Sequence, residues 1–255
     1  MRWSLPAWVR SLARGAADFV YPPACRLCLA ELPPHELGGQ ESRFCDRCRN
    51  ELVVTRGLAC LRCGAAIGPF LDPNVPCGLC RDEQFAFERV IRLGVYDGAL
   101  RTACLRSKDR GAEPLAAGLA DLLWECESET LQNAKIDVIV PVPQHWFRRL
   151  FHPHHAAETL ASVWGARLQV PVASHILQKC RRTRPQARLT PSERRVNLRN
   201  AFQAAASAGL SGSVVLLADD VMTTGTTAHE TARVLKKAGA AHVIVAVVAR
   251  GLGRR

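Results

Sequence analysis

The residues best suited to chemistry are a run of acids and threonines around one glycine near the C-terminus. Asp219 and Asp220 end an apolar run, and a helical pattern begins at Thr226, just after Gly225. The free N–H groups and the dipole at a helix start favour an anion, and a glycine lets the backbone approach it. The two carboxylates suit hydroxyl groups instead, so a ribose 5-phosphate would satisfy both parts of the run. The candidate site residues here are Asp219, Asp220, Val221, Met222, Thr223, Thr224, Gly225, Thr226 and Thr227.

Two other interpretations of this run are weaker. Paired acids also occur on the magnesium-binding strand of P-loop nucleotidases. However, the chain contains no Gly-Lys dipeptide, so the phosphate loop of that machinery is missing. A capped helix without a ligand would need only one such polar side chain, whereas this run has four threonines and two acids. Ligand binding is therefore the preferred interpretation.

The elements that must position this run alternate between strand and helix. A buried strand is expected before it and a helix after it, with a further strand near 175–179 and a short helix opened by a capping box at 190–193. This alternation predicts an α/β fold with a parallel sheet, in which ligands bind at the carboxyl ends of the strands. The main strands are expected over 90–96, 136–142, 213–218 and 242–249, and the main helices over 114–127, 156–168 and 226–238.

Eight of the 11 cysteines form four Cys-x-x-Cys pairs before residue 81. Two intervening residues allow a tight turn that directs both sulfurs at one ion, and zinc accepts four thiolates tetrahedrally. No export signal is evident, so the expected compartment is the reducing cytoplasm, where such a set binds metal rather than forming disulfides. We predict two structural Zn²⁺ sites, paired most simply in chain order. Interleaved pairing is the alternative, and iron or redox sites are weaker ones. The predicted ligands are Cys25, Cys28, Cys45 and Cys48, then Cys60, Cys63, Cys77 and Cys80.

Composition and charge indicate a globular protein with anionic ligands. Hydrophobic residues make up 48% of the 255 residues, which is ordinary for a globular protein, and the formal net charge is +11. The net charge falls to about +7 with eight thiolates and two zinc ions counted. A basic surface suits nucleic acid or phosphorylated ligands, with solvated arginines as the alternative. No apolar run is long enough to span a bilayer. An amphipathic helix is expected over 1–22, packed on the protein itself or, alternatively, bound to a membrane surface or a partner.

Motifs over nearly the full length resemble the ComF/GntX family of phosphoribosyltransferase-like proteins. The run 214–227 resembles the phosphoribosyl pyrophosphate (PRPP) motif of type I phosphoribosyltransferases. An N-terminal helix leads into Pro22-Pro23-Ala24-Cys25-Arg26-Leu27-Cys28, four cysteine pairs follow, and Pro141-Val142-Pro143 ends a strand. The segments Thr183-Arg184-Pro185-Gln186, Arg194 and Asn197 to Phe202 resemble the family block that precedes the PRPP motif.

This resemblance implies an architecture and residue roles. It implies an N-terminal helix over 1–22, a double zinc-ribbon module over 23–84 and a phosphoribosyltransferase-like domain over 88–255. Asp219 and Asp220 would contact the ribose hydroxyls of PRPP bound with Mg²⁺, and the loop from Thr223 to Thr227 would hold its 5-phosphate. Residues that would border or face the anion are Val142, Pro143, Lys108 and Arg194. For Lys108, an exposed position after a helix is the other interpretation.

One stretch departs from the family pattern. The family has a run similar to Arg-Gly-Phe-Asn-Gln after the Pro-Val-Pro strand, whereas this chain has Phe151-His152-Pro153-His154-His155. The missing arginine and asparagine weaken the case for pyrophosphate binding and turnover. The histidines here and His145 suggest a metal site only weakly, because Pro153 breaks the helical spacing.

Three functions are in contention. The first is a phosphoribosyltransferase with an unidentified acceptor. The second, which the family resemblance implies, is a DNA-uptake or DNA-handling protein of bacterial competence that would bind single-stranded DNA and other competence proteins. The third is a structural zinc adaptor. A cluster of arginines before the PRPP motif fits a lid over pyrophosphate, a nucleic-acid track or a solvated face; it comprises Arg181, Arg182, Arg184, Arg188, Arg194, Arg195 and Arg199.

Overall fold

The structure is a computed structural model that describes residues 23–32, 43–144, 155–181, 183, 191–205 and 209–251. The chain divides into two compact units, Met1–Glu51 and Leu52–Arg255, so the boundary falls inside the segment that carries the cysteine pairs. The helix expected over 1–22 lies outside the described residues. No helix within the described ranges is long and apolar enough to cross a membrane.

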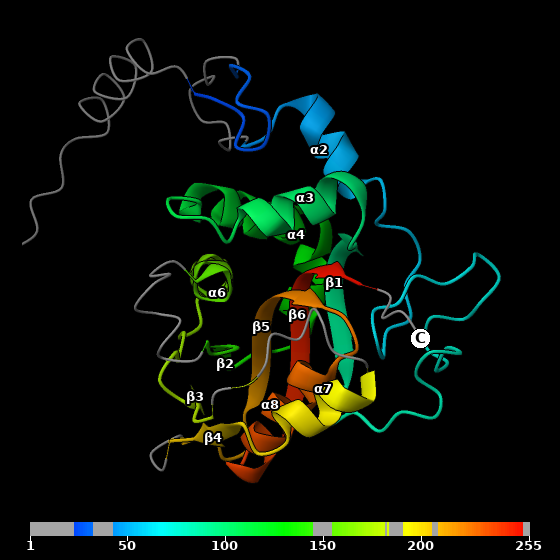
Figure 1. The fold of residues 1–255 in the computed structure, drawn as a ribbon, viewed down its shortest axis with the longest axis vertical. Helices are drawn as coiled ribbons and strands as arrows, with labels where there is room; N and C mark the ends of the chain where they lie inside the picture. The colour runs from blue at the N-terminus through cyan, green and yellow to red at the C-terminus, as the bar shows by residue number, and fades with distance from the viewer. Residues whose placement is uncertain are drawn as a thin grey trace, which may run out of the picture. The chain divides into compact units, whose positions relative to one another are not determined.

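The second unit is built on a four-stranded parallel sheet (Figure 1). Continuous runs of Val, Ile, Leu and Ala bury these strands on both faces, as is typical of parallel sheets. The spatial order is β1-β6-β5-β2, and each neighbouring pair is parallel. The predicted α/β class is confirmed. The strands are β1 (Arg89–Val95), β2 (Val138–Pro141), β5 (Val214–Met222) and β6 (His242–Arg250).

Helices cover both faces of this sheet (Figure 1). Alternate strand residues such as Val215 and Val245 share a core with Leu235 of α8 (Thr226–Lys237). The intervening residues point to the opposite face, where α4 (Glu113–Asn133) and α6 (Ala156–Leu168) pack. The fully buried Trp164 joins these two helices, because its Nε1 donates to the Ala120 carbonyl at 3.0 Å.

A small antiparallel pair lies outside the main sheet. It consists of β3 (Leu177–Lys179) and β4 (Phe202–Ala204), with α7 (Pro191–Leu198) between them in sequence. The expected strand near 175–179 and the short helix after the capping box are both present. β4 contacts α8, so this pair extends the α8 side of the unit.

Some elements differ from their predicted limits. β5 continues to Met222 rather than ending at 218, because its ladder with β6 runs on to the pair Met222–Arg250. The predicted end of the helix at Glu127 coincides with non-helical dihedrals (φ −131°, ψ 16°), but the chain resumes the helix to Asn133. The patterns did not predict two short elements, α2 (Asp46–Val53) and β4. They placed a helix before Lys108 without giving its bounds, and this helix is α3 (Gly98–Arg106).

Candidate functional site

The cysteine sulfurs form two tetrads, in chain order. The sulfurs of each tetrad lie within 4.8 Å of one another. The sulfurs of Cys28 and Cys45 are 3.7 Å apart in the first tetrad, and those of Cys63 and Cys77 are 3.6 Å apart in the second. A tetrahedron with Zn–S bonds of about 2.3 Å has edges of about 3.8 Å. Both tetrads therefore fit zinc. Their members are Cys25, Cys28, Cys45 and Cys48, and Cys60, Cys63, Cys77 and Cys80.

Backbone N–H groups stabilise one cysteine of each tetrad in its thiolate form. Burial opposes ionisation, but N–H groups including those of Cys28 and Cys45 lower the pKa of Cys25 to about 6. The same balance lowers the pKa of Cys60 to about 7. By contrast, burial and the neighbouring Cys60 thiolate raise the pKa of Cys63 to about 11. Four thiolates therefore persist together only with a dication between them, which is the charge that zinc supplies.

The second tetrad is continuous with the sheet of its own unit. Leu61, between Cys60 and Cys63, accepts a hydrogen bond from the β1 residue Val90 at 2.9 Å. Gly64 packs so tightly there that a Cβ would lie 2.8 Å from Val90 Cγ1. The knuckle around Cys60 and Cys63 is thus built into the edge of the domain that carries the candidate phosphate loop.

The acid pair lies at the carboxyl end of β5, within the strand. The structure brings Lys108, in the turn after α3, against this pair, with its Nζ 2.7 Å from Asp220 Oδ2. Burial alone would raise the pKa of Asp220, but the Lys108 ammonium holds it below its ordinary value. For Asp219, burial and the adjacent Asp220 charge raise the pKa well above its ordinary value. The negative charge of the pair is thus favoured on Asp220, beside Lys108, and disfavoured on Asp219.

The strand leads into a preformed helix start. Gly225 has φ +78°, the left-handed conformation, and α8 begins at the next residue. The hydroxyls of Thr224 and Thr226 lie 2.9 Å apart, and the Gly225 carbonyl accepts the His229 N–H at 2.8 Å. The first N–H groups of α8 have no intrahelical partner, so this end of the helix is suited to an anion.

The structure describes only some of the other predicted site residues. Val142 follows β2 and donates its N–H to the Ala218 carbonyl at 2.9 Å, so it lies beside the residue that precedes the acid pair. Pro143 comes next and is half-buried. Arg194 lies within α7, but its side chain is outside the described atoms. Of the divergent stretch, only His155 is described. It is buried just before α6, with Nδ1 3.6 Å from Glu158 Oε1.

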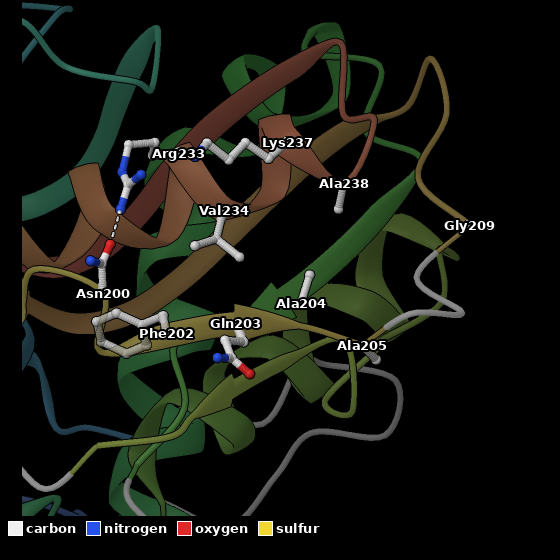
Figure 2. Close-up of a pocket in the computed structure, with 10 residues that line it drawn as sticks. All are labelled: Asn200, Phe202, Gln203, Ala204, Ala205, Gly209, Arg233, Val234, Lys237 and Ala238. Atoms are coloured by element: carbon white, nitrogen blue, oxygen red, sulfur yellow. Dashed lines mark hydrogen bonds between the residues drawn. The ribbon is translucent and has the colours of Figure 1, made fainter.

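A groove of about 560 Å³ lies elsewhere, between β4 and the second half of α8 (Figure 2). Arg233 and Lys237 reach it from α8, and Gln203 and Phe202 from β4. At 1.5 Å per residue, Arg233 lies roughly 12 Å along the helix from Gly225. The groove is therefore separate from the phosphate loop. Sequence patterns did not reveal it, because its walls meet only through the packing of β4 on α8.

Asp219→Asn is expected to raise the melting temperature at pH 7, by about 2–4 °C for a gain of about 1 kcal/mol. The raised pKa of Asp219 means that its contribution to stability is present below the unfolded pKa of an aspartate and is lost as pH rises towards the folded pKa. A neutral amide avoids that loss, so the gain should disappear near pH 4. Calorimetric melting between pH 4 and 8 measures this.

Asp220→Asn is the matched control for that experiment. The pKa of Asp220 is lowered, so its ion pair with Lys108 stabilises the fold above the unfolded pKa and is lost as pH falls. This variant should therefore melt lower than the wild type at pH 7. If Asp219→Asn also melted lower at pH 7, the raised pKa of Asp219 would be contradicted.

Comparisons with known proteins agree with this geometry. A model of the phosphoribosyl transferase domain matches residues 155–255, and a model of the double zinc ribbon domain matches residues 16–82. "Competence protein F" of Haemophilus influenzae is 27% identical over 81% of this chain and 96% of its own length. "DNA utilization protein YhgH" is 29% identical in Salmonella typhi and 28% identical in Escherichia coli K12, over 91% of this chain and 98% of theirs.

Among solved structures, the chain is similar to the glutamine PRPP amidotransferase of B. subtilis complexed with ADP and GMP. The TM-score is 0.35 at 17% identity, over 56% of this chain and 28% of that one.

The sheet, the loop and the two tetrads define a phosphoribosyltransferase-domain protein that carries a double zinc ribbon. The chain is similar over most of its length to curated proteins named for competence and DNA utilization, as the resemblance to the ComF family implies. The predicted family resemblance, the fold class and the zinc-ribbon module are confirmed.

Proposed function

We propose that this protein binds PRPP with Mg²⁺, or another ribose 5-phosphate, at the carboxyl end of β5. The observation that carries the proposal is the acid pair placed directly before a preformed helix start. The 5-phosphate would accept hydrogen bonds from the Thr223–Thr227 loop and the N–H groups of α8. The carboxyl groups of Asp219 and Asp220 would contact the ribose hydroxyls. Mg²⁺ prefers carboxylate and phosphate oxygens and would be held between this pair and the ligand.

The same geometry supports transfer of the phosphoribosyl group to an acceptor. The bond from the anomeric carbon to pyrophosphate would break, a bond to the acceptor would form, and the acceptor would lose its proton to solvent. Asp220, ionised beside Lys108, would stabilise the positive charge that develops on the ribose. Lys108 would then remain close to the departing anion. Zinc thiolates need reduced cysteines, so we place the protein in the cytoplasm.

Isothermal titration of zinc-loaded protein with PRPP and Mg²⁺ tests the proposal. The wild type should give a saturable heat, and Asp219→Asn/Asp220→Asn should bind roughly tenfold or more weakly, because hydrogen bonds to charged groups are lost. Asp72→Asn/Asp82→Asn removes the same two charges from exposed positions and should bind normally. Absence of a saturable heat with the folded, zinc-loaded wild type would overturn the proposal.

A second candidate function is single-stranded DNA handling alongside other competence proteins. Its support is the names of the relatives, which refer to competence and DNA utilization, together with the net charge of +11. This function requires an affinity for single-stranded DNA that falls steeply as salt rises, since phosphate contacts release counterions. Salt-independent or absent DNA binding would remove it.

A further inference from the structure

A buried arginine joins the second zinc tetrad to the candidate phosphate loop. Arg250 ends β6 and is 5% exposed. Its Nε donates to the carbonyl of the zinc ligand Cys63 at 2.7 Å. Its Nη1 donates to the Met222 carbonyl at 3.3 Å and also to the carbonyls of Thr223 and Gly251. One guanidinium thus holds both the zinc knuckle and the first residues of the loop.

The positive charge of the buried Arg250 needs a negative charge nearby. Within the described part of the chain, its hydrogen bonds all go to neutral carbonyl oxygens, and no carboxylate pairs with it. Burying an uncompensated guanidinium would be strongly destabilising. Four thiolates around one Zn²⁺ carry a net charge of about −2, and this tetrad lies directly behind the Cys63 carbonyl. The loaded zinc site therefore supplies the counter-charge that the arginine needs.

A second contact reaches the other end of the loop from the same ribbon. Arg62 donates to the Cys80 carbonyl at 3.0 Å and to the Glu83 carbonyl at 2.6 Å, and its guanidinium lies 5.9 Å from the centre of the Phe85 ring. Phe85 in turn packs against Gly225, where an added Cβ would lie 3.3 Å from its ring. The ribbon is therefore connected to the start of the segment 222–225 through Arg250 and to its end through Phe85.

We propose that Arg250 is a positioning residue through which the second zinc site sets the conformation of the phosphate loop. Zinc binding at Cys60, Cys63, Cys77 and Cys80 fixes the Cys63 carbonyl and supplies negative charge. Arg250 then holds the carbonyls of Met222 and Thr223, so that the N–H groups of the following residues point towards the ligand. The consequence for PRPP affinity rests on the function proposed above, whereas the coupling itself does not.

The test combines hydrogen–deuterium exchange of the segment 219–227 with PRPP–Mg²⁺ titration and zinc analysis. Arg250→Met should keep both zinc ions, speed exchange in this segment roughly tenfold and weaken PRPP binding by a similar factor. Arg250→Lys keeps the charge beside the thiolates, but one ammonium cannot serve both sets of carbonyls. Its exchange and affinity should be intermediate.

Arg92→Met is the matched control. Arg92 is also a buried arginine, 4% exposed, but it lies in mid-β1 and its Nη1 donates to the Thr55 carbonyl at 3.3 Å. Because the charges of Arg92 and Arg250 repel each other, loss of Arg92 should not speed loop exchange beyond the wild-type rate. The proposal is overturned if Arg250→Met exchanges like Arg92→Met. If Arg250→Met does not fold, the exchange rate of Arg250→Lys tests the proposal instead. A wild-type exchange rate in Arg250→Lys would overturn the proposal. Failure of wild-type PRPP binding would refute the proposed function only, because the exchange measurement still tests the coupling.

Discussion

Cys60→Ser should lower the zinc content from two ions to one and lower the melting temperature of the second unit by more than about 10 °C. Structural zinc contributes roughly 10–16 kcal/mol of binding free energy in small metal-dependent modules. In this chain the loss spreads beyond the ribbon. The Leu61 carbonyl accepts the Val90 N–H from β1, and the Cys63 carbonyl accepts Arg250 Nε from β6. Loss of this zinc site therefore loosens the ends of two sheet strands.

Cys25→Ser provides the matched comparison. It removes a buried ligand of equivalent position, because Cys25 N–H donates to the Ala30 carbonyl at 2.8 Å just as Cys60 N–H donates to that of Ala65 at 2.9 Å. This tetrad belongs to the unit Met1–Glu51, so the variant should also retain one zinc ion but leave the main melting transition close to that of the wild type. Metal analysis and scanning calorimetry measure both quantities. If both variants lowered the main melting temperature equally, the prediction that only the second zinc site stabilises the second unit would be wrong.

Gly225→Val should weaken PRPP–Mg²⁺ binding by about a hundredfold or more and lower the melting temperature by several degrees. Gly225 has φ +78°, where a β-branched residue is strongly disfavoured. A Cβ there would also lie 3.1 Å from Met222 Cε and 3.3 Å from Phe85 Cε1. The backbone should rotate to relieve both, which turns the first N–H groups of α8 away from the phosphate. Loss of several charge-assisted hydrogen bonds accounts for the magnitude.

Gly212→Val separates backbone strain from damage to the site. Gly212 has a nearly identical φ of +73°, but it is exposed and an added Cβ would meet nothing within 4 Å. We expect this variant to lose stability and to keep its affinity for PRPP. Calorimetric titration and melting on both variants measure the difference. Comparable affinities for the two valine variants would show that the backbone at Gly225 does not shape the site.

Local chemistry in the sequence determined the zinc sites, the elements and the position of the loop. Two residues between cysteines allow a tight local turn that directs both sulfurs at one ion, whatever the rest of the fold. The two tetrads are therefore present as predicted. Long apolar runs gave the sheet strands, and the helix over 156–168 has the predicted limits. The sequence also indicates the role of Gly225, because a residue without a Cβ lets the backbone at a helix start approach an anion closely.

Only the tertiary structure decided which distant groups meet around that loop. The ladder with β6 keeps Asp219 and Asp220 in a strand, although aspartate has low intrinsic strand propensity. Lys108 reaches Asp220 because the turn after α3 lies over the end of β5. Arg250 contacts Cys63 across 187 residues of sequence. These pairings arise from strand order and packing between non-local elements, and no periodicity within a short segment records which strand lies beside which.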